Sequence, residues 1–240
     1  MGRSAVALTL ALAIGVLGLY TCWPRPADLR GFDPAAMARL ETAMWRDYYE
    51  KHYPALFYHL YEVSRTQFGF APSDSVRIAL SAAEAARTFQ PTRSRDAANA
   101  ALPPLVTYYR LLANAAPGGF DVAEAARLEL DWWQARREKA GPRDYGVTVA
   151  RVAAITYGKP AGDAVMLQSG VARADAMAYR DARGHAMADA DWSEIEGQLL
   201  HAYQLLKTAV AGRRPDDRIR AFNQGNKKAP DDAGAFELVS

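Results

Sequence analysis

The sequence predicts an all-α protein, with an N-terminal transmembrane or signal-anchor helix followed by an irregular helical bundle of about seven or eight helices. The first observation is a charge-free apolar run at the start of the chain. The second is that apolar residues after position 33 recur at helical spacing. The third is that no segment alternates as a strand would. Residues 147–155 contain β-branched side chains, but their apolar spacing suits a helix equally well. No repeat of 34 or about 40 residues indicates a solenoid.

Residues 5–23 form the apolar run, which contains no charge and is followed by Pro24-Arg25-Pro26. A helix rises about 1.5 Å per residue, so this run approaches the roughly 30 Å thickness of the hydrocarbon core. Tyr20 and Trp23 would then lie in the interfacial aromatic belt. The predicted organisation is a membrane anchor or signal segment (1–24), a linker (25–32), an all-α globular domain (33–211) and a polar tail, disordered alone (212–240).

Three kinds of export segment compete: an uncleaved signal anchor, a cleaved signal and a lipoprotein signal ending at Cys22. Cleavage requires small residues, whereas residues 19–23 are mostly bulky, and Thr21 occupies the position where a lipobox has Gly, Ala or Ser. We therefore favour the anchor and keep Cys22 as a candidate lipidation site. Arg3 precedes the segment and Arg25 follows it, so the positive-inside count is nearly balanced. The expected location is the inner membrane, single pass, with the domain periplasmic or extracellular.

The rest of the chain divides at prolines and glycines into helical segments. Asp33-Pro34 is a helix start, because an acceptor at the N-cap and a proline in the first turn both favour one. Ser73 is expected to cap a third helix, and Pro103-Pro104 must end or kink a fourth at Leu102. The predicted helical segments are 33–52, 54–68, 73–89, 95–114, 121–139, 144–157, 162–183 and 191–211.

The last four segments are bounded by glycines and by acidic capping residues. Asp121 with Glu124, and Asp191 with Glu194, have the spacing of a capping box. The final helix carries the most continuous apolar stripe and should dock on the core. After residue 212 the chain turns polar, as expected of a tail that orders only on a partner.

Composition and charge exclude several classes of protein. The 240 residues are 50% hydrophobic and 23% charged, typical of one globular domain with appendages. The net charge of +2 selects neither nucleic acid nor an acidic partner. A single cysteine excludes an internal disulfide framework and a thiolate-rich metal cluster.

Three clusters of aromatic and charged residues, at 45–53, 129–137 and 179–183, hold five of the eight candidate site residues. Glu41 and Glu129 each lie beside an apolar stripe, so each would need a hydrogen-bond donor if buried. The favoured interpretation is a network that ties helices together, and the alternative is a polar cleft that binds a ligand or supplies an acid and a base. The candidate residues are Glu41, Arg46, His59, Glu62, Glu129, Arg136, Arg137 and Arg180.

Catalytic and metal-binding signatures are absent from the sequence. A di-iron bundle needs two Glu-x-x-His pairs, whereas His59 and Glu62 have the reverse order and are expected to form a solvated or interhelical polar pair. No phosphate-binding loop, G-x-S-x-G or H-E-x-x-H is present. No catalytic, cofactor-binding or metal-binding residue is therefore predicted, and no cofactor.

These observations favour a membrane-anchored helical accessory or scaffold protein that acts through protein–protein contacts on the external side of a bacterial-type inner membrane. Its expected partners are the lipid bilayer, through residues 5–23, and a protein bound by the 212–240 tail, with no nucleic acid. The alternative is an envelope ligand-binding protein or hydrolase with a Glu/Arg/Tyr-lined cleft, and a non-enzyme is favoured.

Overall fold

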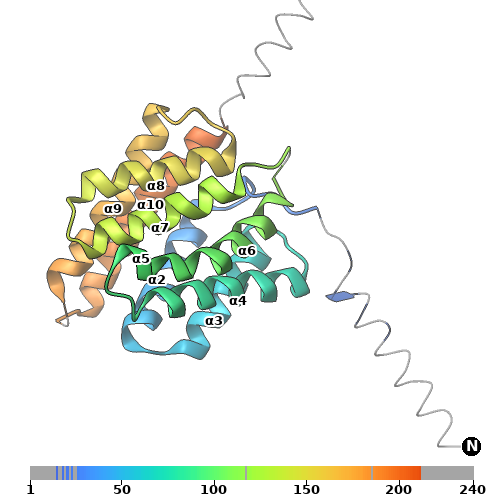
Figure 1. Ribbon diagram of the computed structural model, residues 1–240, viewed down its shortest axis with the longest axis horizontal. Helices are drawn as coiled ribbons and strands as arrows, with labels where there is room; N and C mark the ends of the chain where they lie inside the picture. Colours follow the sequence, from blue (N-terminus) through green and yellow to red (C-terminus); the bar gives the residue numbers. More distant parts are fainter. Residues whose placement is uncertain are drawn as a thin grey trace, which may run out of the picture.

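A computed structural model describes residues 26–116, 118–184 and 186–211, together with Gly15, Gly18, Tyr20, Thr21 and Trp23. Within these residues the regular structure is entirely helical, which confirms the all-α class (Figure 1). Eight of the α-helices have ten or more residues, in agreement with the predicted number. The elements are α2 (Pro34–Glu50), α3 (Tyr53–Glu62), η1 (Val63–Gln67), α4 (Pro72–Phe89), α5 (Arg95–Ala98), η2 (Asn99–Ala101), α6 (Leu102–Ala113), α7 (Val122–Arg137), α8 (Pro142–Tyr157), α9 (Ala164–Arg183) and α10 (Asp189–Ala211).

Two predicted helix starts use the expected capping residue. The Asp33 carboxylate accepts a hydrogen bond from the Ala36 amide at 2.8 Å, and the Asp121 carboxylate accepts one from the Glu124 amide at 2.9 Å. Each cap satisfies an amide that has no partner within the helix. Glu124 forms an ion pair with Arg127.

The predicted cap at Ser73 is wrong. Ala71 is the N-cap of α4 and Pro72 its first residue, so Ser73 already lies inside the helix. Proline is favoured in the first turn because an amide there needs no helical partner. The Ser73 hydroxyl instead donates to the Thr21 carbonyl at 2.9 Å, which ties the N-terminal segment to α4.

The predicted interruption at Pro103-Pro104 is confirmed, but its form differs from a kink. The chain makes the short α5 and the 3₁₀ turn η2, and α6 then starts at Leu102 with both prolines in its first turn. The second predicted helix likewise ends in the π-helical turn η1.

The eight longer helices form a closed ring. Each of α2, α3, α4, α6, α7, α8, α9 and α10 packs against the next, and α10 returns to pack against α2. Figure 1 shows α3, α4 and α6 on one side of the molecule and α8, α9 and α10 on the other. The middle of the ring must therefore be filled by side chains rather than by another helix.

Two hydrophobic clusters share this ring. One is built mainly from α6, α7 and α8, and the other mainly from α2, α9 and α10. Leu29 is buried in the first and Phe32 in the second, so the segment predicted as a linker contributes to both. Trp45, Phe68 and Tyr157 are half-buried and pack against both clusters.

The helix pair α8 and α9 meets at glycine. A Cβ atom on Gly170 would lie 2.6 Å from the Ala150 amide nitrogen, and one on Gly146 would lie 2.8 Å from the Val171 Cα. Only residues without a Cβ allow the two backbones to approach this closely.

Among the described residues, no helix combines the length and the apolarity needed to cross a bilayer. Most of the predicted anchor, Cys22 included, lies outside the described residues, as does the tail from residue 212.

Candidate functional site

Glu41 of α2 is only 3% exposed and lies at the centre of a three-helix contact. Arg173 of α9 forms an ion pair with both carboxylate oxygens, its Nε lying 2.9 Å from Oε1. The Tyr203 hydroxyl of α10 donates to Oε2. A buried carboxylate needs such charge-assisted partners, because desolvation alone would strongly disfavour its charge.

Arg173 is the cation that makes this burial tolerable. Burial acts to lower the pKa of its guanidinium, but Glu41, Tyr203 and Glu129 outweigh burial and raise the pKa above the ordinary value. The guanidinium lies 5.8 Å from the ring of Trp132 and keeps 29% of its side chain exposed. Arg173 is therefore charged at every accessible pH and partly open to solvent.

Glu129 of α7 forms a second, adjoining network. Its Oε2 accepts from the Tyr109 hydroxyl of α6 at 2.8 Å, and its Oε1 accepts from Trp133 Nε1 at 3.0 Å. Burial raises the pKa of the neighbouring Tyr108, and the Glu129 charge raises it further. Glu41 and Glu129 thus lie on helices at opposite positions in the ring, and the charges of both raise the pKa of Arg173.

Arg136 and Arg180 meet at the Asp181 carboxylate. Arg136 Nε and Nη2 donate to Asp181 at 2.9 and 2.8 Å, and Nη2 also donates to the Tyr49 hydroxyl at 2.8 Å. Arg180 stacks on the Tyr49 ring, 3.1 Å from its centroid, and Arg180 Nε is buried with no hydrogen-bond partner among the described residues. These contacts join α7 and α9 to α2.

The remaining candidates lie apart from these networks. Arg137 donates to Thr92 and to the Phe89 carbonyl and stacks on the Phe89 ring. Arg46 is exposed and pairs with Glu50 and Asp189.

His59 does not pair with Glu62. Its Nδ1 lies 2.7 Å from Asp47 Oδ2, across the α2–α3 contact. The Glu62 side chain is half-buried and forms no ion pair or hydrogen bond with another described residue. The structure therefore brings together Glu41 with Glu129 and Arg136 with Arg180, and leaves the others separate.

Arg173, which pairs with Glu41 and is also influenced by the charge of Glu129, is not among the residues predicted from the sequence. Its position carried a usable signal, since Met166, Gly170, Ala174 and Met177 recur at helical spacing on α9 and Arg173 falls on the same face. An arginine on an apolar helix face requires a partner with the opposite charge. Glu41 likewise lies beside the apolar stripe of α2.

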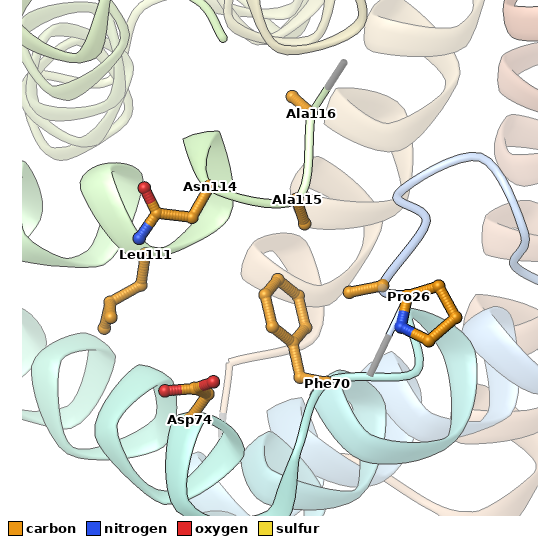
Figure 2. A pocket seen from close by; sticks show the side chains of 8 residues that line it. Pro26, Phe70, Asp74, Leu111, Asn114, Ala115 and Ala116 are labelled. Carbon is orange, nitrogen blue, oxygen red and sulfur yellow. The ribbon is translucent and has the colours of Figure 1, made fainter. Parts of the chain in front are cut away.

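A pocket of about 320 Å³ lies elsewhere, between the segment before α2 and the ends of α4 and α6 (Figure 2). In Figure 2 the Phe70 ring lies between Pro26 and the C-terminal end of α6, and the Asp74 carboxylate lies on the α4 side. Its lining consists of Pro26, Ala27, Phe70, Asp74, Leu111, Asn114, Ala115 and Ala116. None of the candidate residues from the sequence belongs to it.

Over the described part of the chain, no three His, Cys, Asp or Glu side chains gather as a metal site. No protein-family model matches the chain, and no curated protein or solved structure shows significant similarity to it.

Proposed function

We propose that this protein is a membrane-tethered helical accessory or scaffold protein that acts through protein–protein contacts on the external side of a bacterial-type inner membrane. One observation carries the non-enzymatic part of this proposal. All four carboxylate oxygens of Glu41 and Glu129 accept a hydrogen bond from side chains of the same ring. Carboxylates engaged in this way hold helices together, which supports a structural role for both residues.

The tether is proposed from residues 5–23, whose length and lack of charge fit a single span. Protease added to spheroplasts tests the orientation. The expected result is loss of the domain before lysis, and survival of the domain until lysis would place it on the cytoplasmic side.

The partner contact is proposed for the polar tail, residues 212–240. Mild detergent extraction followed by size analysis should recover the full chain in an assembly larger than a monomer. A chain that ends at Ala211 should lose this assembly and keep its helicity by circular dichroism. An unchanged assembly would exclude the tail as the contact, and a monomeric full chain would exclude the function itself.

A second candidate is a ligand-binding protein or hydrolase that uses the middle of the ring. Arg173 remains 29% exposed, and the hydroxyls of Tyr108 and Tyr157 make no hydrogen bond with another described residue. These groups are hydrogen-bond donors for a small polar ligand in this second candidate function. Replacing Glu129 with Gln discriminates the two functions. If the variant loses stability while its binding of small molecules is unchanged, the structural role is supported.

A further inference from the structure

Most of the exposed large hydrophobic side chains belong to three chain segments that contact one another, which together are called the apolar side. Six of the seven found among the described residues belong to the N-terminal segment, α3 and α4, and the seventh belongs to α8. The seven are Tyr20, Trp23, Tyr53, Tyr58, Val76, Leu80 and Val147. Scattered exposed residues need no explanation, but a concentration next to one chain segment does.

The α4 part of this side begins where the N-terminal apolar segment ends. The Ser73 hydroxyl donates to the Thr21 carbonyl at 2.9 Å. Val76 and Leu80 follow three and seven residues later, which places them about 5 and 10 Å further along the helix axis. They are four residues apart and so share a helix face. Leu80 is 55% exposed.

The neighbouring helix α3 extends this apolar side. It packs between α2 and α4, yet none of its ten residues is buried. Its sequence is nevertheless the most apolar of the described helices, with Leu56, Phe57, Leu60 and Tyr61 only half-buried. In Figure 1 α3 and α4 lie side by side on the outer edge of the molecule.

Charges on this stretch of α4 are paired. Arg77 lies 3.5 Å from Asp74, and Arg87 lies 2.7 Å from Glu84. This stretch of α4 is therefore nearly neutral, so an anionic or cationic partner finds no complementary charge on it.

We infer that the α4 face formed by Val76 and Leu80, with α3 beside it, lies against the lipid bilayer at the level of the headgroups. The inference rests on the proposed tether, which would hold this face at the surface. Because the contact is apolar and the charges are paired, zwitterionic lipid is sufficient and anionic lipid adds little. Tyr20 and Trp23 provide the aromatic side chains that this boundary favours.

Nitroxide labelling of the full chain in phosphatidylcholine vesicles tests this inference. One label replaces Leu80 (Leu80→Cys) and the control label replaces Val147 (Val147→Cys), both in a Cys22→Ser background. Val147 is a matched control because it is an exposed apolar residue on α8. Collision rates with oxygen, which partitions into lipid, and with a water-soluble nickel chelate are measured by electron paramagnetic resonance.

The expected ratio of oxygen to nickel collisions is several-fold higher at position 80 than at position 147. Adding phosphatidylglycerol or salt should leave this ratio unchanged. Equal ratios in a chain that resists alkaline carbonate extraction would overturn the docked face and leave the tether intact. A chain that carbonate removes from the vesicles would overturn the tether and the docked face together. A ratio that appears only with phosphatidylglycerol would overturn the apolar mode of contact.

Discussion

The side chain of Arg173 explains how two carboxylates can lie inside a helical ring. Glu41 is separated from Arg173 by 132 residues and from Tyr203 by 162 residues, yet the three side chains form one contact. A buried ion pair adds little net stability by itself, because desolvation offsets the attraction, but removing one partner leaves an uncompensated charge. The network is therefore more important for holding one arrangement of α2, α9 and α10 than for the total free energy.

Replacing Glu41 with Ala should lower the free energy of unfolding by about 3–5 kcal/mol, because it leaves Arg173 without its partner. Urea denaturation measures the change. Glu62→Ala is the control, since the Glu62 side chain contacts no charged partner among the described residues, and it should change the free energy by no more than about 0.5 kcal/mol.

Joint replacement of Glu41 and Arg173 with Met should be less destabilising than Glu41→Ala, since no charge is then left unpaired. The matched single variants are Glu41→Met and Arg173→Met. If the double variant loses the sum of these two single losses, the pair does not act as a unit and this account of the core is wrong.

Helix boundaries were predictable where the signal was local. The caps at Asp33 and Asp121 and the interruption at Pro103-Pro104 depend on residues within one turn, so the sequence was sufficient. Ser73 was mistaken for a cap because Pro72 can begin the helix by itself, and the Ser73 hydroxyl has a distant partner. No local pattern reports such a partner.

Asp191 shows the same limit at α10. The sequence predicted it as the N-cap, whereas the helix already begins at Asp189 and the Asp191 carboxylate reaches back to the Ala188 amide at 2.9 Å. That is the role of the acidic residue in a capping box. The hydrogen bond from Ala188, followed by those from Tyr179 and Arg183, lowers the pKa of Asp191.

Because the folded-state pKa of Asp191 is lowered, its contribution to stability is complete above the ordinary carboxyl pKa of about 4. It is lost as the pH falls through the lowered value. Asp191→Asn should therefore reduce the melting temperature near neutral pH, and the difference from the unmodified chain should shrink in strong acid. Glu196→Gln is the control, because the exposed Glu196 side chain of α10 forms no ion pair or hydrogen bond with another described residue. A difference that stays constant down to strong acid would refute the assignment.

Two helical glycines are expected to respond in opposite ways to replacement by alanine, because one lies in the contact between α8 and α9 and the other has open space around it. Gly170→Ala introduces a methyl group 2.6 Å from the Ala150 amide, so the helices must separate and the free energy of unfolding should fall by roughly 1–3 kcal/mol or more. A methyl group on Gly197 of α10 would meet no described atom within 4 Å, so Gly197→Ala should stabilise by up to about 1 kcal/mol. Thermal melts distinguish the two, and equal effects would exclude a close backbone contact at Gly170.

At the scale of the whole molecule, the closure of the ring is the feature that the sequence did not predict. Helical spacing showed which faces are apolar, but not that α10 returns to pack against α2. The candidate site depends on that closure, because Glu41 and Tyr203 lie on these two helices. Glu41 and Glu129 were identified from their positions beside apolar stripes, whereas their partners depend on contacts between distant segments.

The ring also predicts how the protein unfolds in alkali. Burial raises the pKa of six tyrosines above the ordinary value, and the pKa of Tyr145 rises to about 12. The six are Tyr48, Tyr108, Tyr109, Tyr145, Tyr157 and Tyr203. A raised folded-state pKa means that the stabilisation is complete below the unfolded pKa of about 10 and is lost as the pH rises through the folded value. Loss of helicity and ionisation of these six tyrosines should therefore occur together as the pH rises from about 10 to 12.

Tyr145→Phe provides the decisive comparison for this alkaline transition. The Tyr145 hydroxyl donates to the Ala174 carbonyl at 2.8 Å, so its removal should cost about 1 kcal/mol at neutral pH. The same change removes one group whose ionisation opposes folding, so stability should fall less steeply between about pH 10 and 12 than in the unmodified chain. Equal slopes would show that Tyr145 ionises without unfolding the ring, which its burial between α8 and α9 does not permit.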